Sequence, residues 1–214
     1  MQPGDLTVPT LAIEQTGHMQ WTVVIPVKPA AIGKSRLGLG AEVARAIALD
    51  TVAAAVSCSA VARVIVVTAD AAFRPPGAEL LIEAAPSGID AAVASGAELA
   101  GIGAARAALL GDLPSLLPEE LAAALAAAHS MMLEHPRTFV SDHEGTGTTL
   151  VTAAPGVELL TAFGGASAAK HRALGLVELD LPVDSSVRFD VDTREQLEAA
   201  IRRNAGSATS AGRG

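Results

Sequence analysis

The sequence predicts a single α/β domain with a doubly wound, mostly parallel sheet flanked by helices. Two observations support this prediction. Short β-branched runs alternate along the chain with Ala-rich segments of helical length, and such alternation is typical of βαβ units. The 214 residues are enough to bury about 70% of the surface that an unfolded chain exposes. The sequence contains no internal repeat and no linker that would divide the domain.

Strands are expected where β-branched and other apolar residues run together. The first, residues 21–27, reads as a buried strand, and the second, residues 63–68, is almost purely β-branched. The run 106–110 is expected to be a central strand, since Gly111 and Asp112 end it like a loop at a sheet edge. The other expected strands are residues 79–83, 138–141, 148–152 and 176–179.

Helices are expected between these strands, at residues 41–58, 89–99, 118–129 and 167–174. Pro118 suits a first helical position. Thr193 and Gln196 match a capping box, so a last helix is expected to begin at Thr193. Residues 1–20 are expected to form a flexible extension and residues 204–214 a disordered tail, which leaves 21–203 as the folded domain.

Composition excludes several classes of function. The net charge of −8 argues against nonspecific nucleic-acid binding, and the absence of tyrosine argues against an aromatic platform for bases. The single cysteine, Cys58, excludes an internal disulfide and a cysteine-based zinc site. No apolar run is long enough to span a membrane, and no secretory signal begins the sequence, so a cytoplasmic protein without a membrane partner is expected.

Three cations follow the first strand within nine residues: Lys28, Lys34 and Arg36. Ligands of open α/β sheets bind beyond the carboxyl ends of strands, so this loop is a candidate phosphate site, although a solvated basic loop is the plainer alternative. The segment also imitates a P-loop, but Lys28 stands where that motif needs glycine. We keep the P-loop as a minor alternative.

Three carboxylates are candidate metal ligands. Asp112 follows the central strand, and Asp190 and Asp192 share a strand-like phase that would direct both side chains to one side. Taken alone, Asp112 is explained as a turn residue and Asp192 as part of the cap of the last helix. Their occurrence together with the basic loop favours a metal site, and oxygen ligands without a thiolate suit Mg²⁺.

Two further loops are candidate anion sites. In the turn 142–149, backbone N–H groups and threonine hydroxyls such as that of Thr148 could hold a phosphate or carboxylate. In the segment 163–171, small residues precede a short helix whose N-terminus and Lys170 could do the same. A plain turn and an ordinary helix start are the alternatives.

The motifs resemble those of the 2-phospho-L-lactate guanylyltransferase family, above all its actinobacterial phosphoenolpyruvate branch. The resemblance covers about residues 21–203 and is carried by the basic loop, Gly111-Asp112-Leu113-Pro114, Gly145-Thr146-Gly147-Thr148 and Asp190-Val191-Asp192-Thr193. It implies a nucleotidyltransferase fold like that of nucleotide-diphospho-sugar transferases, with a mixed sheet. One departure is Ile89-Asp90, where family members often have Leu-Asn.

The resemblance also implies the reaction and its residues. GTP and phosphoenolpyruvate, or 2-phospho-L-lactate, would give a guanylylated product and pyrophosphate, in the synthesis of a deazaflavin coenzyme. Whether the product passes directly to the next enzyme is left open. The implied roles are Mg²⁺ binding by Asp112, Asp190 and Asp192; acceptor binding by Thr148, Gly164, Ser167 and Lys170; and nucleotide binding by Lys28, Lys34, Arg36, Pro86 and Gly88.

The expected chemistry is in-line attack by the acceptor phosphate on the α-phosphorus of GTP. Asp112, Lys34 and Arg36 are the expected catalytic residues, because charge stabilisation and positioning dominate such transfers. Two alternatives remain. One is a nucleotidyltransferase for another acceptor, a sugar phosphate or a molybdopterin-type cofactor. The other is a nucleotide-binding module without catalysis.

Overall fold

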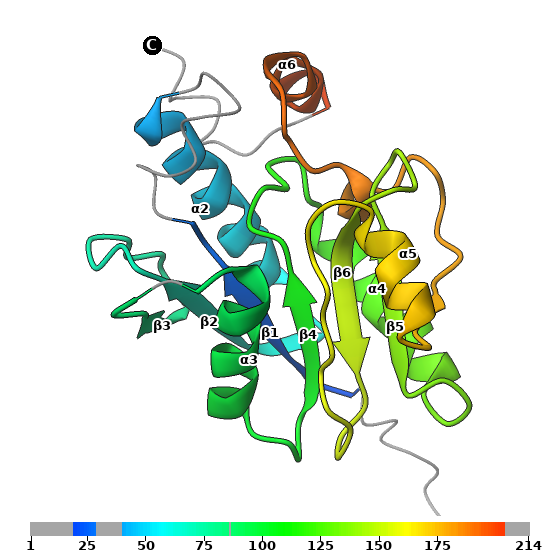
Figure 1. Ribbon diagram of the computed structural model, residues 1–214. Coiled ribbons are helices and arrows are strands. Elements are labelled where there is room, and N and C mark those ends of the chain that lie inside the picture. Colours follow the sequence, from blue (N-terminus) through cyan, green and yellow to red (C-terminus); the bar gives the residue numbers. More distant parts are fainter. Residues whose placement is uncertain (1–18, 29–39, 86, 204–214) are drawn as a thin grey trace, which may run out of the picture.

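In the computed structural model, which describes residues 19–28, 40–85 and 87–203, seven strands form one sheet in the order β3-β2-β1-β4-β6-β5-β7 (Figure 1). Their bounds are β1 (Trp21–Pro26), β2 (Val61–Thr68), β3 (Glu79–Ile82), β4 (Ala105–Leu109), β5 (Arg137–Ser141), β6 (Thr148–Ala153) and β7 (Val177–Glu178). The expected strands are confirmed, each within two residues at either end.

One reversed strand makes the sheet mixed. β1 is parallel to β2 and β4, β2 is parallel to β3, and β5 is parallel to β7. β6 is antiparallel to both of its neighbours, β4 and β5. The reason is the short turn between β5 and β6, since only antiparallel strands can be joined by a tight hairpin while parallel ones need a long crossover. The predicted doubly wound, mostly parallel sheet is therefore confirmed.

The helices also agree with the sequence prediction to within two residues. They are α2 (Ala41–Ser57), α3 (Ile89–Ala100), α4 (Pro118–Met131), α5 (Ser167–Ala173) and α6 (Arg194–Arg202). The short 3₁₀ helix η1 (Ser186–Arg188) was not predicted from the sequence. In α6, the Thr193 side chain and Gln196 form the expected capping box. Within the described ranges, no helix combines the length and apolar character needed to cross a membrane.

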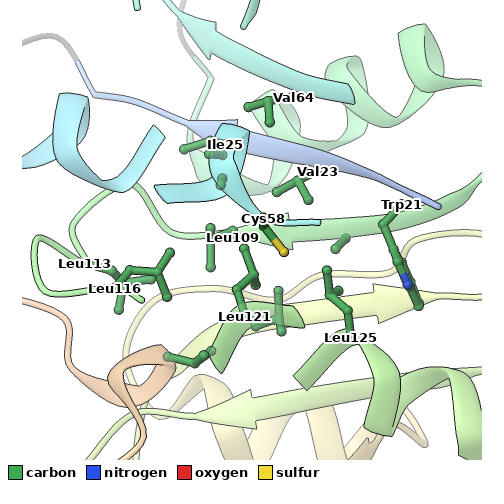
Figure 2. Close-up of a cluster of buried hydrophobic side chains, with 14 of the residues drawn as sticks. Trp21, Val23, Ile25, Cys58, Val64, Leu109, Leu113, Leu116, Leu121 and Leu125 are labelled. Carbon is green, nitrogen blue, oxygen red and sulfur yellow. The ribbon is translucent and has the colours of Figure 1, made fainter. Parts of the chain in front are cut away.

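Alternate residues of β1 supply cores on both faces of the sheet. Val23 and Ile25 belong to the larger core, which includes Leu121 and Leu125 of α4 and is shown in Figure 2. Val24 points to the opposite face and packs in a cluster with Ala92 of α3. This alternation is what a strand buried on both faces requires. Helices α2 and α4 thus cover one face and α3 and α5 the other (Figure 1).

Helix α3 sits close to the sheet because it carries Gly96 at the contact. A Cβ atom built on Gly96 would lie 2.3 Å from Cγ1 of Val24 and 3.0 Å from Cγ2 of Val67. The methyl group of an alanine at position 96 would therefore clash with Val24 unless β1 or α3 moved. The helix bears Gly88 and Ile89 at its start, so its depth also sets the position of the loop that precedes it.

We predict that Gly96→Ala destabilises the protein, although alanine is ordinarily the better helix former by about 1 kcal/mol. Overpacking of a buried contact costs about 1–3 kcal/mol, which would lower the melting temperature by roughly 2–12 °C in a domain of this size. Thermal unfolding checks this, with Ser95→Ala on the exposed side of α3 as the control. A melting temperature at or above wild type for Gly96→Ala would show that the contact yields easily.

Candidate active site

The sequence motifs converge at the carboxyl ends of β1 and β4. Lys28 follows β1, Asp112 follows β4, and Asp190 and Asp192 lie between η1 and α6. The backbone N–H of Val191 donates a 3.0 Å hydrogen bond to the carbonyl of Asp112. This bond ties together two segments that are nearly eighty residues apart in the sequence.

Helix α2 restrains the loop after β4. The Leu113 N–H donates a 3.0 Å hydrogen bond to the Thr51 hydroxyl, a buried group of that helix. A Cβ atom on Gly111 would lie 3.1 Å from the carbonyl oxygen of Pro26. Glycine therefore lets the loop pack tightly against the end of β1, and the position of Asp112 is fixed by backbone contacts on both sides.

Asp112 is an unsatisfied buried carboxylate. Its Oδ1 atom is buried and has no hydrogen-bond partner among the described residues. Burial, followed by the charge of Asp192, raises the pKa of Asp112 to about 6, while Lys28 acts in the opposite direction. A buried oxygen without a donor is costly unless something else supplies positive charge.

Asp190 is still more strongly perturbed. Its side chain is 14% exposed. Burial, and after it the charges of Asp112, Asp192 and Asp142, together raise its pKa to about 8. Neighbouring carboxylates repel each other unless a cation joins them, so the donor set and its charge fit a hard divalent cation.

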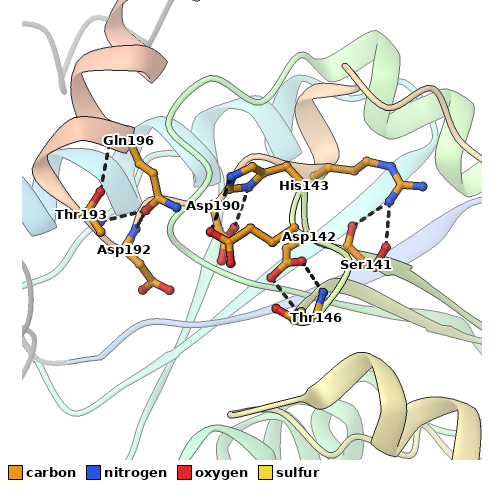
Figure 3. Close-up of polar contacts among 11 residues, drawn as sticks. Ser141, Asp142, His143, Thr146, Asp190, Asp192, Thr193 and Gln196 are labelled. Carbon is orange, nitrogen blue, oxygen red and sulfur yellow. Dashed lines mark hydrogen bonds and ion pairs between the residues drawn. The ribbon is translucent and has the colours of Figure 1, made fainter.

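Asp192 is exposed, and it does not cap the last helix with its side chain. That role belongs to Thr193, whose hydroxyl accepts from the Gln196 N–H at 3.1 Å, while Gln196 Oε1 accepts from the N–H groups of Asp192 and Thr193 (Figure 3). The Asp192 carboxylate is thus left for the site. The segment 190–192 is irregular rather than a strand, so the strand-like phase expected for its two aspartates does not apply.

The predicted ligands are neighbours without being assembled around an ion. In the part of the chain that the structure describes, no three His, Cys, Asp or Glu side chains are arranged to hold a metal as they stand. Burial, with the charges of neighbouring aspartates added to it, nevertheless raises the pKa values of Asp112 and Asp190.

The segment that carries Asp190 is anchored to α4. Glu120 accepts hydrogen bonds from the Ser186 N–H and the Ser185 hydroxyl, and the Ser186 hydroxyl accepts from the Leu117 N–H. On the other side, Arg188 donates to the carbonyl and the hydroxyl oxygen of Ser141. These bonds fix η1, and η1 in turn sets where the following aspartates begin.

Sequence reasoning missed His143. Its Nδ1 lies 3.9 Å from Asp190 Oδ1 (Figure 3). Its ring stacks on Phe189 with centroids 5.2 Å apart. The guanidinium of Arg203 covers the same Phe189 ring at 3.8 Å. Nothing in the sequence pairs His143 with Asp190 across 47 residues. The one available signal in the sequence is that His143 lies in the turn 142–149, a candidate anion site.

In that turn, two backbone donors are already engaged. Asp142 accepts hydrogen bonds from the N–H groups of Thr146 at 2.9 Å and Gly147 at 2.7 Å (Figure 3). A side chain at Gly147 would displace the Asp142 carboxylate, because a Cβ atom there would lie 2.3 Å from Asp142 Oδ2. The expectation that these N–H groups grip a ligand is therefore wrong for Thr146 and Gly147.

The candidate acceptor residues lie together beside this turn. Thr148 begins β6 and Ser167 begins α5, and both are 2% exposed. Helix α5 is joined to the turn before β6 by a 3.1 Å hydrogen bond from the Ala168 N–H to the Thr146 carbonyl. Gly164, which has a φ of 103°, and Lys170 of α5 are both exposed.

The loop that leads to Ser167 is held by two side chains from elsewhere in the chain. The Ala162 N–H donates to Nε2 of His171 at 2.9 Å, and the Phe163 N–H donates to Oδ1 of Asp90 at 3.0 Å. The departure at Asp90 is thereby explained in part, since an asparagine side-chain oxygen could accept the same bond.

The remaining predicted residues belong to the nucleotide side. Lys28 is exposed, and Gly88 is exposed at the N-cap of α3 with φ of 106°. Lys34, Arg36 and Pro86 lie outside the described residues, as do residues 1–18 of the expected extension 1–20 and the whole expected tail 204–214. Met19 packs against the larger core, and Gln20 donates to the Ser59 carbonyl, so contacts with the domain begin before β1.

Comparison with known proteins identifies close relatives over most of the chain. A phosphoenolpyruvate guanylyltransferase of Streptomyces coelicolor is 49% identical over 208 residues, which are 90% of this chain and 95% of the relative. A protein of the same name from Streptomyces avermitilis is 46% identical over 206 residues, 90% of this chain and 94% of the relative. No protein-family model matches the chain.

Solved structures support the fold at lower sequence similarity. A nucleotidyl transferase from Methanothermobacter matches with a TM-score of 0.54 and 18% identity, over 88% of this chain and all of that one. Rv0371c of Mycobacterium tuberculosis, solved in complex with manganese, matches with a TM-score of 0.55 and 15% identity, over 86% and 98% of the two chains. The sheet and its helices therefore form a nucleotidyltransferase-like fold.

We predict that Asp190→Asn stabilises the metal-free protein more at pH 9 than at pH 5. The pKa of Asp190 is raised on folding to about 8, so its protonated form favours the folded state below the unfolded pKa, and that stability is lost as pH rises towards 8. The increase in the free energy of unfolding caused by Asp190→Asn should be larger at pH 9 than at pH 5 by at least about 1 kcal/mol, which corresponds to roughly 2–4 °C in melting temperature.

Thermal unfolding in EDTA at the two pH values measures this difference. Asp184→Asn, an exposed carboxylate outside the cluster, is the control and should show the same shift at both. Equal shifts for Asp190→Asn and the control would mean that the carboxylates do not oppose one another.

Proposed function

This chain belongs to the phosphoenolpyruvate guanylyltransferase family, and we propose that it transfers GMP from GTP to phosphoenolpyruvate with release of pyrophosphate. The names of its relatives support the reaction. The observation that carries the proposal is the cluster of Asp112, Asp190 and Asp192, a group of mutually repelling carboxylates at the end of the sheet. Synthesis of a deazaflavin coenzyme is the proposed setting, with 2-phospho-L-lactate as an alternative acceptor.

In the proposed reaction, a phosphate oxygen of the acceptor attacks the α-phosphorus of GTP. A new bond forms between that oxygen and the α-phosphorus, and the bond from the α-phosphorus to the bridging oxygen of pyrophosphate breaks. The acceptor phosphate is already ionised, so no side chain has to remove a proton. The protein acts by holding two anions in line and by offsetting their charge.

Asp112, Asp190 and Asp192 are the proposed ligands of Mg²⁺. When bound, the ion would neutralise charge on the α-phosphate. The chain's own contribution is positional. Backbone bonds hold Asp112 against Val191, and Glu120 anchors the segment before Asp190. Exposed Asp192 is the ligand that can adjust when the ion arrives.

The two substrates are proposed to bind on either side of this cluster. On the nucleotide side, the proposed residues are Lys28, Lys34, Arg36, Pro86 and Gly88, with Lys34 and Arg36 steadying the pyrophosphate as it leaves. On the acceptor side, they are Thr148, Gly164, Ser167 and Lys170. The small loop around Gly164 and Gly165 suits a compact acceptor that carries a phosphate and a carboxylate.

The test of this function is pyrophosphate release from GTP with a panel of acceptors: phosphoenolpyruvate, 2-phospho-L-lactate, 3-phosphoglycerate and a sugar phosphate. We expect release to require Mg²⁺ and to be fastest with phosphoenolpyruvate, with a product mass equal to the acceptor plus GMP less water. Turnover only with a sugar phosphate, or tight GTP binding without turnover, would contradict the proposal.

We predict that Asp112→Asn and Asp192→Asn each lower kcat by at least about 100-fold, because each removes charge from the metal site. Asp184→Asn should leave kcat within about twofold, since it lies outside the cluster. Steady-state kinetics at saturating substrates and several Mg²⁺ concentrations provide the measurement. Near-wild-type turnover in both cluster variants would remove the metal assignment while leaving the family membership intact.

We predict that Lys34→Ala and Arg36→Ala raise the KM for GTP about tenfold or more, because a lost contact to a charged phosphate costs roughly 1.5–3 kcal/mol. The KM for the acceptor should change much less. Arg137→Ala is the matched control, since Arg137 begins β5 at the opposite end of the sheet. A rise confined to the acceptor's KM would assign these cations to the other substrate.

A further inference from the structure

His171 is the most enclosed polar side chain near the acceptor loops. It is 0% exposed. Its ring lies between two aromatic rings, with centroids 5.7 Å from Phe139 and 5.5 Å from Phe163. The ring therefore cannot rotate freely, and both of its nitrogens are hydrogen-bonded. A buried histidine fixed in this way can determine the direction of every hydrogen bond that it makes.

The hydrogen bond from Ala162 fixes the tautomer of His171. A backbone N–H is always a donor, so Nε2, 2.9 Å from the Ala162 nitrogen, must be the acceptor and carry no proton. Burial lowers the pKa of His171; Asp90 and a backbone hydrogen bond at Ser167 oppose this effect, and Lys170 adds to it. The ring is therefore neutral, and its one proton resides on Nδ1.

This tautomer determines what the Thr148 hydroxyl can do. Nδ1 of His171 lies 2.9 Å from Thr148 Oγ1 and, since it carries the proton, donates to it. The hydroxyl hydrogen of Thr148 then has no acceptor on His171. Across the described ranges, Thr148 Oγ1 makes no other hydrogen bond. A buried donor left without a partner is costly, unless a ligand accepts its hydrogen bond.

The same ring also holds the loop on the other side of the acceptor residues. Through Ala162 it restrains the chain just before Gly164, where Asp90 restrains Phe163 in parallel. Two residues later, Ala166 has a left-handed φ of 55°, and Ser167 then begins α5. The His171 ring is thus hydrogen-bonded to the Thr148 side chain and to the backbone N–H of Ala162 in the loop that leads to Ser167.

We propose that His171 is a positioning residue for the acceptor, which leaves the Thr148 hydroxyl as a free donor to an anionic oxygen and fixes the loop before Ser167. The inference rests on the proposed function, because it assumes that Thr148 and Ser167 face the acceptor. His171 itself contacts neither substrate. Its effect should appear in the affinity for the acceptor and depend on Thr148.

The first measurement needs neither a variant nor an activity assay. Long-range ¹H–¹⁵N NMR correlations of the full-length, ¹⁵N-labelled protein report which ring nitrogen of each histidine is protonated. We expect His171 to carry its proton on Nδ1, the tautomer that is less common in free histidine. A proton on Nε2, or on both nitrogens at pH 7, would overturn the inference whatever the substrate proves to be.

The second measurement is a double-mutant cycle with acceptor and GTP titrated separately. His171→Phe should raise the acceptor's KM about tenfold or more, with less than about a threefold change for GTP. Thr148→Val should cost about tenfold or more in the wild-type background but less than about threefold in the His171→Phe background. Additive penalties, or equal rises in both KM values, would overturn the inference.

Thr138→Val is the matched control for both arms. It removes a buried hydrogen bond between Thr138 of β5 and Thr152 of β6, the strand that also carries Thr148. It leaves the hydrogen bond between Thr148 and His171 intact. It should leave both KM values unchanged. If wild-type protein fails to guanylylate phosphoenolpyruvate, the proposed function fails while the tautomer result still stands. If phosphoenolpyruvate is used but the cycle is additive, only the role of His171 fails.

Discussion

Repulsion among closely spaced carboxylates is the constraint on which this site depends. Burial raises the pKa of both Asp112 and Asp190, the charge of Asp112 adds to the rise at Asp190, and the charge of Asp192 adds to both. Left alone, such a group would separate, so the surrounding structure has to hold it. Thr51 restrains the Asp112 loop, Val191 is bonded to the Asp112 carbonyl, and Glu120 anchors the approach to Asp190. These restraints hold together carboxylates that repel one another, so stability is given up locally at this edge of the sheet.

The sequence was most informative where local rules decide the outcome. β-branched runs gave the strands to within two residues, Pro118 opened α4, and the Thr193 and Gln196 pair capped α6 as expected. The carboxylate motifs were recognised because loops at the carboxyl ends of strands converge. These features need only neighbouring residues or a general rule of α/β sheets, which is why one sequence was sufficient.

The sequence was least informative where a side chain's partner is distant. His143 approaches Asp190 across 47 residues, and Asp90 reaches the Phe163 N–H across 73. Neither pairing follows from spacing or composition. The turn at Asp142 misled for a different reason, because its backbone donors proved to be used internally by a carboxylate of the same turn. Such an Asx-type contact competes with ligand binding and is visible only once the turn is folded.

The reversed strand explains how the proposed acceptor residue Thr148 comes to lie at the same edge of the sheet as Asp112. β6 is antiparallel to β4, so its first residues lie beside the last residues of β4, with Leu109 opposite Leu150 and the Leu110 N–H bonded to the Thr149 carbonyl. Thr148 therefore lies at the same edge as Asp112. A parallel strand in this place would begin at the other edge of the sheet, about five residues or roughly 15 Å away. The single antiparallel strand thus brings Thr148, the proposed acceptor residue, to the edge of the sheet that carries Asp112.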